Sequence, residues 1–317
     1  MKVAVIGGGK VGLAVLRELQ ELRGVSEIVL VGRTLKKVQG EVDDYRDAAV
    51  LKDYPSPRFS SGGYEMTEGC DVLIYTAGSS KVSTDRMEML TENYTIAKEI
   101  FTQVNRYNQN GVIVCVTNPL DVITTAVRDI TNRDRKKVIG TGTLLDSARL
   151  ARYIAELVEL SPDSVNMYVV GEHGNSSVPL LSSCRICGKS FEDYFIEEAG
   201  GGQISAEYLS RVVRAAGFKI FNNKGYTSYG VACAACKIVS AIVRDTRQLL
   251  PISVVLEGEY GLHGFAVSTP CIIGREGIMS VKEMRMTENE SEQFQKSAKV
   301  VQDAVNSLCR VYTKNEA

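Results

Sequence analysis

The 317-residue sequence has no tryptophan, only two histidines and no excess of either charge, because 37 Lys and Arg stand against 38 Asp and Glu for a net charge of −1. Without a basic excess a protein does not hold a nucleic-acid backbone by counterion release, so we expect no nucleic-acid partner. No apolar run approaches the roughly 18–20 residues of a membrane span. The first ten residues, MKVAVIGGGK, also lack the apolar length and cleavage site of a secretory signal. We therefore expect no membrane contact and a cytoplasmic location.

The eight cysteines include two pairs with the spacing of metal ligands, Cys184 with Cys187 and Cys233 with Cys236. The first pair lies in a strand-like stretch, where side chains three residues apart face opposite sides. The second pair lies in an apolar, helix-like stretch, where we expect both side chains in the core. We therefore predict no metal site and, in a reducing cytoplasm, no disulfides. A zinc-bound module is the alternative that the spacing leaves open.

The first half of the chain alternates short apolar strands with helical patterns. A strand at residues 2–6 is followed by apolar residues at helical spacing, and the same order recurs further along. This alternation indicates a parallel sheet covered by helices on both faces. We predict an α/β fold with a Rossmann-type, doubly wound parallel sheet. The expected strands are 2–6, 27–31, 70–78 and 111–119, and the expected helices are 10–22, 85–108 and 120–131.

The second half has a different character, because short strands are scattered among long helices in an α+β pattern. We place the boundary near residue 142, which gives a dinucleotide-binding domain at 1–142 and a second, α+β substrate domain at 143–317. The expected strands are 165–170, 183–187, 253–257 and 270–273, and the expected helices are 145–159, 204–219, 226–245 and 288–312.

A glycine motif, Gly7-x-Gly9-x-x-Gly12, lies between the first strand and the first helix. In this context the motif is typical of dinucleotide-binding sites. Gly7 makes the tight turn, Gly9 lets the backbone approach a pyrophosphate, and Gly12 lets the helix pack close to the strand. The N-terminus of the helix supplies N–H donors and a partial positive charge.

The end of the second strand, VLVGRTLKK, departs from the usual NAD pattern. Gly32 occupies the place where an acidic residue normally binds the ribose hydroxyls. Arg33 can bind a 2′-phosphate with its fork of donors, and Thr34 can add a hydroxyl. We therefore predict that NADP(H) is favoured over NAD(H). The alternative is that Arg33 points to solvent and that NAD binds less tightly.

Polar residues with catalytic chemistry stand at turns and helix starts along the rest of the chain. Asn118 lies in TNPLDV, Arg86 in STDRMEML, and Asp146 and Arg149 lie one helical turn apart in GTGTLLDSARLAR. His173 lies between two glycines in GEHGNSSVP. Each also has an ordinary explanation. Asn118 could be a turn residue and Arg86 a solvated helix start. Asp146 could be a helix cap, Arg149 part of a surface ion pair, and His173 a loop histidine.

Together with NKGYTSYGVA, these motifs resemble the lactate/malate dehydrogenase family, and the later ones are most similar to its L-2-hydroxyisocaproate dehydrogenase branch. They run from residue 7 to residue 232 in family order, and TPCIIGREGI extends the resemblance over essentially the whole chain. The resemblance implies an enzyme that transfers a hydride between a nicotinamide cofactor and an L-2-hydroxy acid/2-oxo acid pair. It also implies a homodimer or homotetramer.

The resemblance assigns a role to each catalytic candidate. His173 would donate and accept the proton, with flanking glycines that bend the backbone and leave space for substrate. Asp146 would orient His173 and favour its protonated form. Arg149 would bind the substrate carboxylate through a bidentate pair. Arg86 would close with the 78–85 loop and polarise the carbonyl.

The resemblance also implies residues that line the site. Asn118 would hold the substrate and the nicotinamide region, and Thr227 would line the side-chain end of the substrate pocket. Val116 and Asn93 match positions that line the cofactor. From the residues alone, Val116 could be ordinary sheet core and Asn93 a solvated helix position.

Departures from the family pattern leave the substrate open. The loop AGSSKVSTDR lacks the Pro-Gly pair common before the family's arginine, so the specificity position could be Ser80 or Lys81. Lys81 pointing inward would favour oxaloacetate and a malate dehydrogenase; otherwise pyruvate or a bulkier aliphatic 2-oxo acid fits. The branch resemblance favours the aliphatic acids. Outside this class, the chain could be a nucleotide-binding sensor that has lost turnover.

Overall fold

A computed structural model describes residues 1–53, 55–79, 86–198 and 204–313. The chain forms two compact units, and the first cut between them falls between Thr141 and Gly142. Both units are discontinuous, because later segments of the chain return to the first one. Unit 1 comprises Met1–Thr141, Ser228–Gln248 and Ile272–Ser280, and unit 2 comprises Gly142–Thr227, Leu249–Cys271 and Val281–Ala317.

Unit 1 contains six parallel strands in the order β6-β5-β4-β1-β2-β3. β1, β2, β4 and β5 are almost entirely buried, as helices on both faces of a parallel sheet require. The strand order reverses between β1 and β4, which is the place where doubly wound sheets bind ligands. The strands are β1 (Lys2–Ile6), β2 (Glu27–Val31), β3 (Arg58–Gly62), β4 (Val72–Tyr75), β5 (Val112–Cys115) and β6 (Val138–Gly140).

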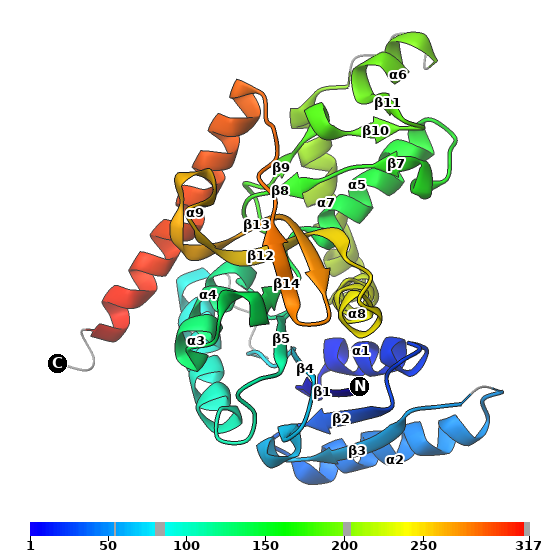
Figure 1. Cartoon of the computed structure of the whole chain (residues 1–317), viewed down its shortest axis with the longest axis vertical. Helices are drawn as coiled ribbons and strands as arrows, with labels where there is room; N and C mark the ends of the chain where they lie inside the picture. The colour runs from blue at the N-terminus through cyan, green and yellow to red at the C-terminus, as the bar shows by residue number, and fades with distance from the viewer. Residues whose placement is uncertain (54, 80–85, 199–203, 314–317) are drawn as a thin grey trace. The chain divides into compact units, whose positions relative to one another are not determined.

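Helices cover both sides of these strands. α1 packs against α8 on one side and α3 packs against α4 on the other, while α2 lies along β3 (Figure 1). α8 comes late in the sequence but belongs to unit 1, where the Cys236 thiol donates to the carbonyl of Val15 on α1. The helices are α1 (Lys10–Gln20), α2 (Leu35–Val50), α3 (Arg86–Val104), α4 (Leu120–Thr131) and α8 (Tyr229–Arg244).

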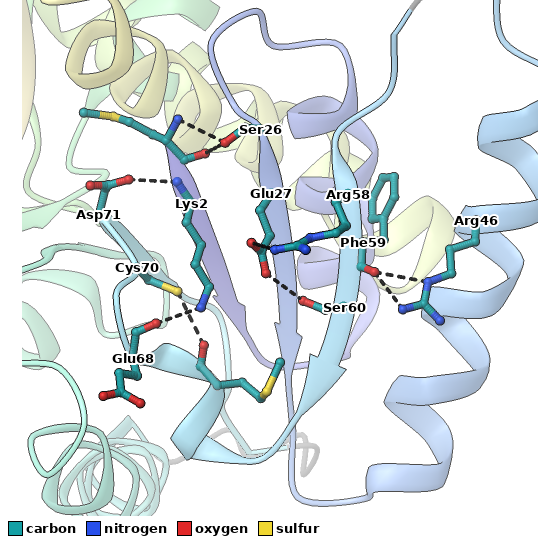
Figure 2. Close-up of polar contacts among 12 residues, drawn as sticks. Lys2, Ser26, Glu27, Arg46, Arg58, Phe59, Ser60, Glu68, Cys70 and Asp71 are labelled. Atoms are coloured by element: carbon teal, nitrogen blue, oxygen red, sulfur yellow. Dashed lines mark hydrogen bonds and ion pairs between the residues drawn. The ribbon is translucent and has the colours of Figure 1, made fainter.

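Polar side chains hold the outer strands in register (Figure 2). Glu27 of β2 accepts from Arg58 at 2.6 Å and from Ser60 at 3.3 Å, both on β3. Arg46 of α2 donates to the carbonyl of Phe59 through Nε at 3.1 Å and NH2 at 2.8 Å. The edge strand β3 therefore keeps its place through side-chain contacts on both sides, although its sequence, RFSSG, is mostly polar.

Unit 2 is built from helices and short strands around an apolar core. That core includes Leu150 and Ile154 of α5, Leu209 of α7 and Val169 of β8, all fully buried. The helices are α5 (Leu144–Leu157), α6 (Phe191–Glu197), α7 (Ala206–Lys224) and α9 (Glu288–Thr313), and the short strands are β7 (Val165–Asn166), β8 (Val169–Val170), β9 (Val178–Pro179), β10 (Arg185–Ile186) and β11 (Lys189–Ser190). The longer strands β12 (Gln248–Glu257), β13 (His263–Gly274) and β14 (Gly277–Val281) pair in the order β14-β13-β12. Most of β12 and β13 belongs to unit 2, whereas β14 belongs almost entirely to unit 1.

The predicted fold class is confirmed, and the predicted helices lie close to their observed bounds. The predicted strand 165–170 is instead two short strands, β7 and β8, and the predicted strands 253–257 and 270–273 are only the C-terminal parts of β12 and β13. The sequence did not predict α2, β3, β6 and β14 in unit 1, or α6, β9 and β11 in unit 2. It was also wrong about Cys233, because only Cys236 of that pair is buried and Cys233 is exposed on α8. Over the described residues, no helix is long and apolar enough to cross a membrane.

Candidate active site

The glycine turn after β1 leaves no room for side chains at two of its three glycines. Gly7 has φ +122°, and a Cβ there would lie 2.7 Å from the backbone nitrogen of Ala77. A Cβ on Gly12 would overlap the carbonyl oxygen of Gly7. Gly9 differs, because it has ordinary extended backbone as the N-cap of α1 and a Cβ there would meet nothing within 4 Å. The turn thus needs Gly7 and Gly12 for packing, whereas Gly9 keeps the approach to the α1 N-terminus open. These features fit the pyrophosphate of a dinucleotide.

The turn after β2 places the predicted adenosine-end residues at the surface. Gly32 donates its N–H to the carbonyl of Gly62 at 3.2 Å, and a Cβ there would lie 2.7 Å from Val38 Cγ1. Arg33 and Thr34 are exposed immediately after it. A glycine is therefore the residue that this turn accepts without rearrangement, and the positive charge of Arg33 stands beside it.

Asn93 of α3 joins the loops that follow β4 and β5. Its Oδ1 accepts from the N–H of Ser79 at 2.7 Å, and its Nδ2 donates to the carbonyl of Asn118 at 2.7 Å. Asn93 is buried, whereas Asn118 is exposed and Val116 is buried at the end of β5. Asn93 is therefore a clamp between two loops at the carboxyl ends of neighbouring strands, and not a solvated helix position.

In unit 2, one carboxylate contacts both of the other predicted catalytic side chains. Oδ2 of Asp146 lies 2.7 Å from Nδ1 of His173, and Oδ1 accepts from NH1 of Arg149 at 3.2 Å. The side chains of Asp146, Arg149 and His173 are 9%, 16% and 26% exposed. The carboxylate is thus the innermost member, the guanidinium is somewhat more exposed, and the imidazole is the most exposed of the three.

His173 and Arg149 together decide the direction in which the pKa of Asp146 is shifted. Burial by itself raises the pKa of this carboxyl, but the charge and hydrogen bond of His173, followed by those of Arg149, outweigh burial and hold the pKa below its ordinary value. Asp146 is therefore a carboxylate at neutral pH, which is the form that orients an imidazole.

Buried hydroxyls fix the helix that carries Asp146. Thr143, at the N-terminus of α5, donates to the carbonyl of Val169 at 2.5 Å, and the Ser147 hydroxyl accepts from the N–H of Val169 at 2.9 Å. Both hydroxyl residues are buried. Gly217 of α7 faces Arg149, because a Cβ there would lie 3.5 Å from NH1. The sequence reading gave none of these three residues a role, although Thr143 and Ser147 stand inside GTGTLLDSAR.

The structure shows why the two positions that flank Glu172 and His173 require glycine. Gly171 has φ +90°, and a Cβ there would overlap the hydroxyl of Ser297. A Cβ on Gly174 would overlap the carboxylate of Glu172, which folds back over it. Gly171 thus supplies the expected bend, while Gly174 makes room for the acid of this same motif.

Some predicted site residues are not placed beside these groups. Arg86 is the first residue of α3, and its side chain lies outside the described residues, as do Ser80 and Lys81. Thr227 is half-buried in the link between α7 and α8. Among the described residues, no group of three His, Cys, Asp or Glu side chains could hold a metal ion.

Comparison with known proteins identifies the family. The model described as lactate/malate dehydrogenase, NAD binding domain, matches residues 1–140, and the model described as lactate/malate dehydrogenase, alpha/beta C-terminal domain, matches residues 143–310. The chain belongs to the lactate/malate dehydrogenase family. It is accordingly an oxidoreductase of the nicotinamide-dependent 2-hydroxyacid dehydrogenase type.

Individual members of the family match over nearly the full chain. An L-lactate dehydrogenase of Clostridium botulinum (strain Hall) is 33% identical over 310 residues, which cover 96% of each chain. One of Mesomycoplasma hyopneumoniae (strain J) is 34% identical and covers 97% of this chain and 99% of its own. Among solved structures, the minor L-lactate dehydrogenase of Enterococcus mundtii has a TM-score of 0.90 at 28% identity, covering 96% of this chain and 98% of its own. MGS-M5, a lactate dehydrogenase from a deep-sea metagenome library, has a TM-score of 0.91 at 26% identity, covering 97% of this chain and 98% of its own.

Proposed function

We propose that this dehydrogenase acts on a small L-2-hydroxy acid/2-oxo acid pair whose side chain is that of lactate or a bulkier aliphatic acid. The observation that carries the proposal is the single carboxylate of Asp146 in contact with both His173 and Arg149. A 2-oxo acid presents a carboxylate next to a carbonyl, so an imidazole and a guanidinium that contact the same carboxylate match its two polar groups.

In the proposed reaction, His173, Asp146 and Arg149 each have a separate role. When bound, the nicotinamide supplies the hydride to the carbonyl carbon, or takes it back in the reverse direction. His173 hands a proton to the carbonyl oxygen through Nε2, because Nδ1 is engaged by Asp146. Asp146 fixes the ring orientation and stabilises the imidazolium. Arg149 binds the substrate carboxylate in a bidentate pair and so sets the distance between His173 and the carbonyl.

Further residues complete the proposed site. Arg86 would polarise the carbonyl as its loop closes, Asn118 would hold the substrate beside the nicotinamide, and Thr227 would line the end of the substrate pocket. Val116 and Asn93 would shape the cofactor site, in the case of Asn93 by keeping two loops together.

For the cofactor, we propose that NADP(H) is favoured over NAD(H). The turn that normally carries an acidic residue has Gly32 in a position where a Cβ would meet Val38, followed by exposed Arg33 and Thr34. A 2′-phosphate would not be repelled by a carboxylate at position 32, and the guanidinium of Arg33 beside it could donate hydrogen bonds to the phosphate. Gly7 and Gly12 would shape the turn that binds the pyrophosphate, and Gly9 would let the backbone approach it.

The broader organisation is also a proposal. Residues 1–142 would bind the dinucleotide and residues 143–317 would bind the substrate, in a cytoplasmic homodimer or homotetramer. Exposed aromatic side chains at Phe218 and Phe221 of α7 support an interface between subunits, because apolar surface of this kind is commonly covered in an assembly. Light scattering of the purified protein tests the oligomer.

One experiment tests substrate and cofactor together. Initial rates are measured for pyruvate, longer aliphatic 2-oxo acids and oxaloacetate, each with NADH and with NADPH. We expect the highest kcat/KM for an aliphatic acid with NADPH. A preference for oxaloacetate would make the enzyme a malate dehydrogenase, and a clear NADH preference would overturn the role of Arg33. Absence of turnover with every acid would favour a nucleotide-binding sensor.

A further inference from the structure

The turn that carries His173 is closed by a ring of hydrogen bonds. The hydroxyl of Ser176 donates to the Glu172 carboxylate, and the Ser176 backbone N–H donates to Oε2 of that carboxylate at 3.1 Å. The Ser297 hydroxyl accepts from the N–H of Glu172 at 2.8 Å and lies 3.0 Å from the Ser176 hydroxyl. Because the Ser176 proton is committed to the carboxylate, Ser297 must be the donor to Ser176. The ring therefore runs from the Glu172 N–H through the two hydroxyls and back to the Glu172 side chain.

Ser297 is the member of this ring that lies far away in the sequence. It is fully buried on α9, and it lies so close to Gly171 that a side chain at 171 would overlap its hydroxyl. Gly171 in turn exchanges two backbone hydrogen bonds with Ser268 of β13, at 2.9 and 3.1 Å. The start of the turn is thus held between β13 and α9.

α9 has attachments of its own that do not involve the turn. Glu290 accepts from the N–H of Ser182 at 3.0 Å and from the Ser182 hydroxyl at 2.6 Å. The ring of Phe294 packs on that of Tyr260, with centroids 4.6 Å apart. These contacts are made at Glu290, about two helical turns before Ser297, and at Phe294, about one turn before it. The position of the Ser297 hydroxyl is therefore set by α9 and its neighbours rather than by the turn.

We infer that Ser297, acting through Glu172 and Ser176, is a positioning residue that holds the His173 imidazole against Asp146. On the Asp146 side, Thr143 and Ser147 tie α5 to Val169 of β8, just before the turn, by hydrogen bonds that do not involve Ser297. The contact of 2.7 Å between the two catalytic groups then depends on the turn being held in place from α9. This inference rests on the proposed role of His173 and extends it to the C-terminal helix.

A double-mutant cycle tests the inference and separates it from the proposed function. Ser297→Ala should lower kcat by about 10- to 100-fold, the size expected when a reacting group is misplaced by a fraction of an ångström to an ångström. In a His173→Asn background, Ser297→Ala should have no further effect, because nothing remains to be positioned. An equal loss in both backgrounds would overturn the inference. A His173→Asn variant with normal turnover would instead overturn the proposed function.

Matched variants keep the test independent of folding. Ser307→Ala removes a hydroxyl from the same helix, where it donates to the carbonyl of Asp303 at 2.7 Å, and should leave kcat unchanged. Ser176→Ala should lower kcat and Ser176→Thr, which keeps a hydroxyl, should restore it. Hydrogen exchange of the 170–178 peptide gives a readout without turnover: it should quicken in Ser297→Ala and not in Ser307→Ala. Unchanged exchange in Ser297→Ala would contradict the inference.

Discussion

The glycine turn of unit 1 and the His173 cluster of unit 2 are built on opposite principles. The turn is shaped by the absence of side chains, because a Cβ at Gly7 or Gly12 would run into the backbone. The cluster is shaped by charged side chains, because one buried carboxylate contacts an imidazole and a guanidinium. In the proposed function, the turn would accommodate a ligand by its shape, and the cluster would act on a ligand by its charge.

This difference predicts how the two regions respond to substitution. A change in the turn should alter folding and cofactor binding, because packing is what the glycines provide. A change in the cluster should alter turnover or substrate affinity, while cofactor binding stays the same.

The largest effect is expected from His173→Asn, which keeps a planar polar side chain but removes the ring nitrogen that gains and loses a proton near neutral pH. Turnover should fall by about 100- to 10,000-fold, the usual contribution of a general acid–base. The cofactor dissociation constant, measured by fluorescence titration, should change little. His263→Asn, in the other histidine of the chain, is the matched control and should behave as wild type because His263 is exposed in unit 2.

A smaller effect is expected from Arg149→Lys, which keeps the charge and loses the bidentate fork. KM for the 2-oxo acid should rise by roughly 10- to 150-fold, as the loss of about 1.5–3 kcal/mol from a charged hydrogen bond implies. The control is Arg152→Lys on the same helix, whose partner Glu156 is exposed. Equal KM values for the two variants would show that Arg149 does not bind the carboxylate.

Two alanine substitutions separate packing from ligand access in the glycine turn. Gly12→Ala forces α1 away from the turn and should lower the free energy of unfolding by about 1–3 kcal/mol. Gly9→Ala has space for its methyl group, so the free energy of unfolding should change by at most about 1 kcal/mol. Cofactor affinity should nevertheless fall in Gly9→Ala. If both properties stay at wild-type values, Gly9 does not face the pyrophosphate.

The smallest effect concerns the pH dependence of stability. The pKa of Asp146 is lowered in the folded protein, so its ionised form contributes stability above the ordinary carboxyl range. That contribution disappears as pH falls through the lowered pKa. Urea unfolding gives the free energy of unfolding of wild type and of Asp146→Asn from pH 7 to pH 3. The difference between the two free energies should shrink only at the acidic end of this range. A difference that already fades above pH 5 would contradict the assignment.

The sequence predicted the features that repeat locally along the chain. Buried strands such as β1 and β4 have apolar runs, and Gly7 and Gly12 stand at fixed offsets after a strand. It missed β3 because an edge strand can be polar, and α2 because only Val38 and Val42 of that helix are buried. A helix with so few buried positions gives a weak periodic signal.

In the candidate site, too, the sequence predicted contacts between residues that are close along the chain and missed contacts between distant ones. Asp146 and Arg149 lie one helical turn apart, so their proximity was visible in the sequence, whereas the contacts of Asn93, Gly217 and Ser297 join residues that are far apart along the chain. No spacing rule connects a glycine of α7 to Arg149, or a serine of α9 to the turn around His173. These contacts arise only when the helices are packed.

The most direct test of the central claim is a crystal structure of the complex with reduced cofactor and an unreactive 2-oxo acid analogue. The account predicts the guanidinium of Arg149 against the carboxylate of the analogue and Nε2 of His173 within hydrogen-bond distance of its second polar group, with Asp146 still on Nδ1. An analogue bound away from Arg149, or an imidazole turned away from it, would contradict the account.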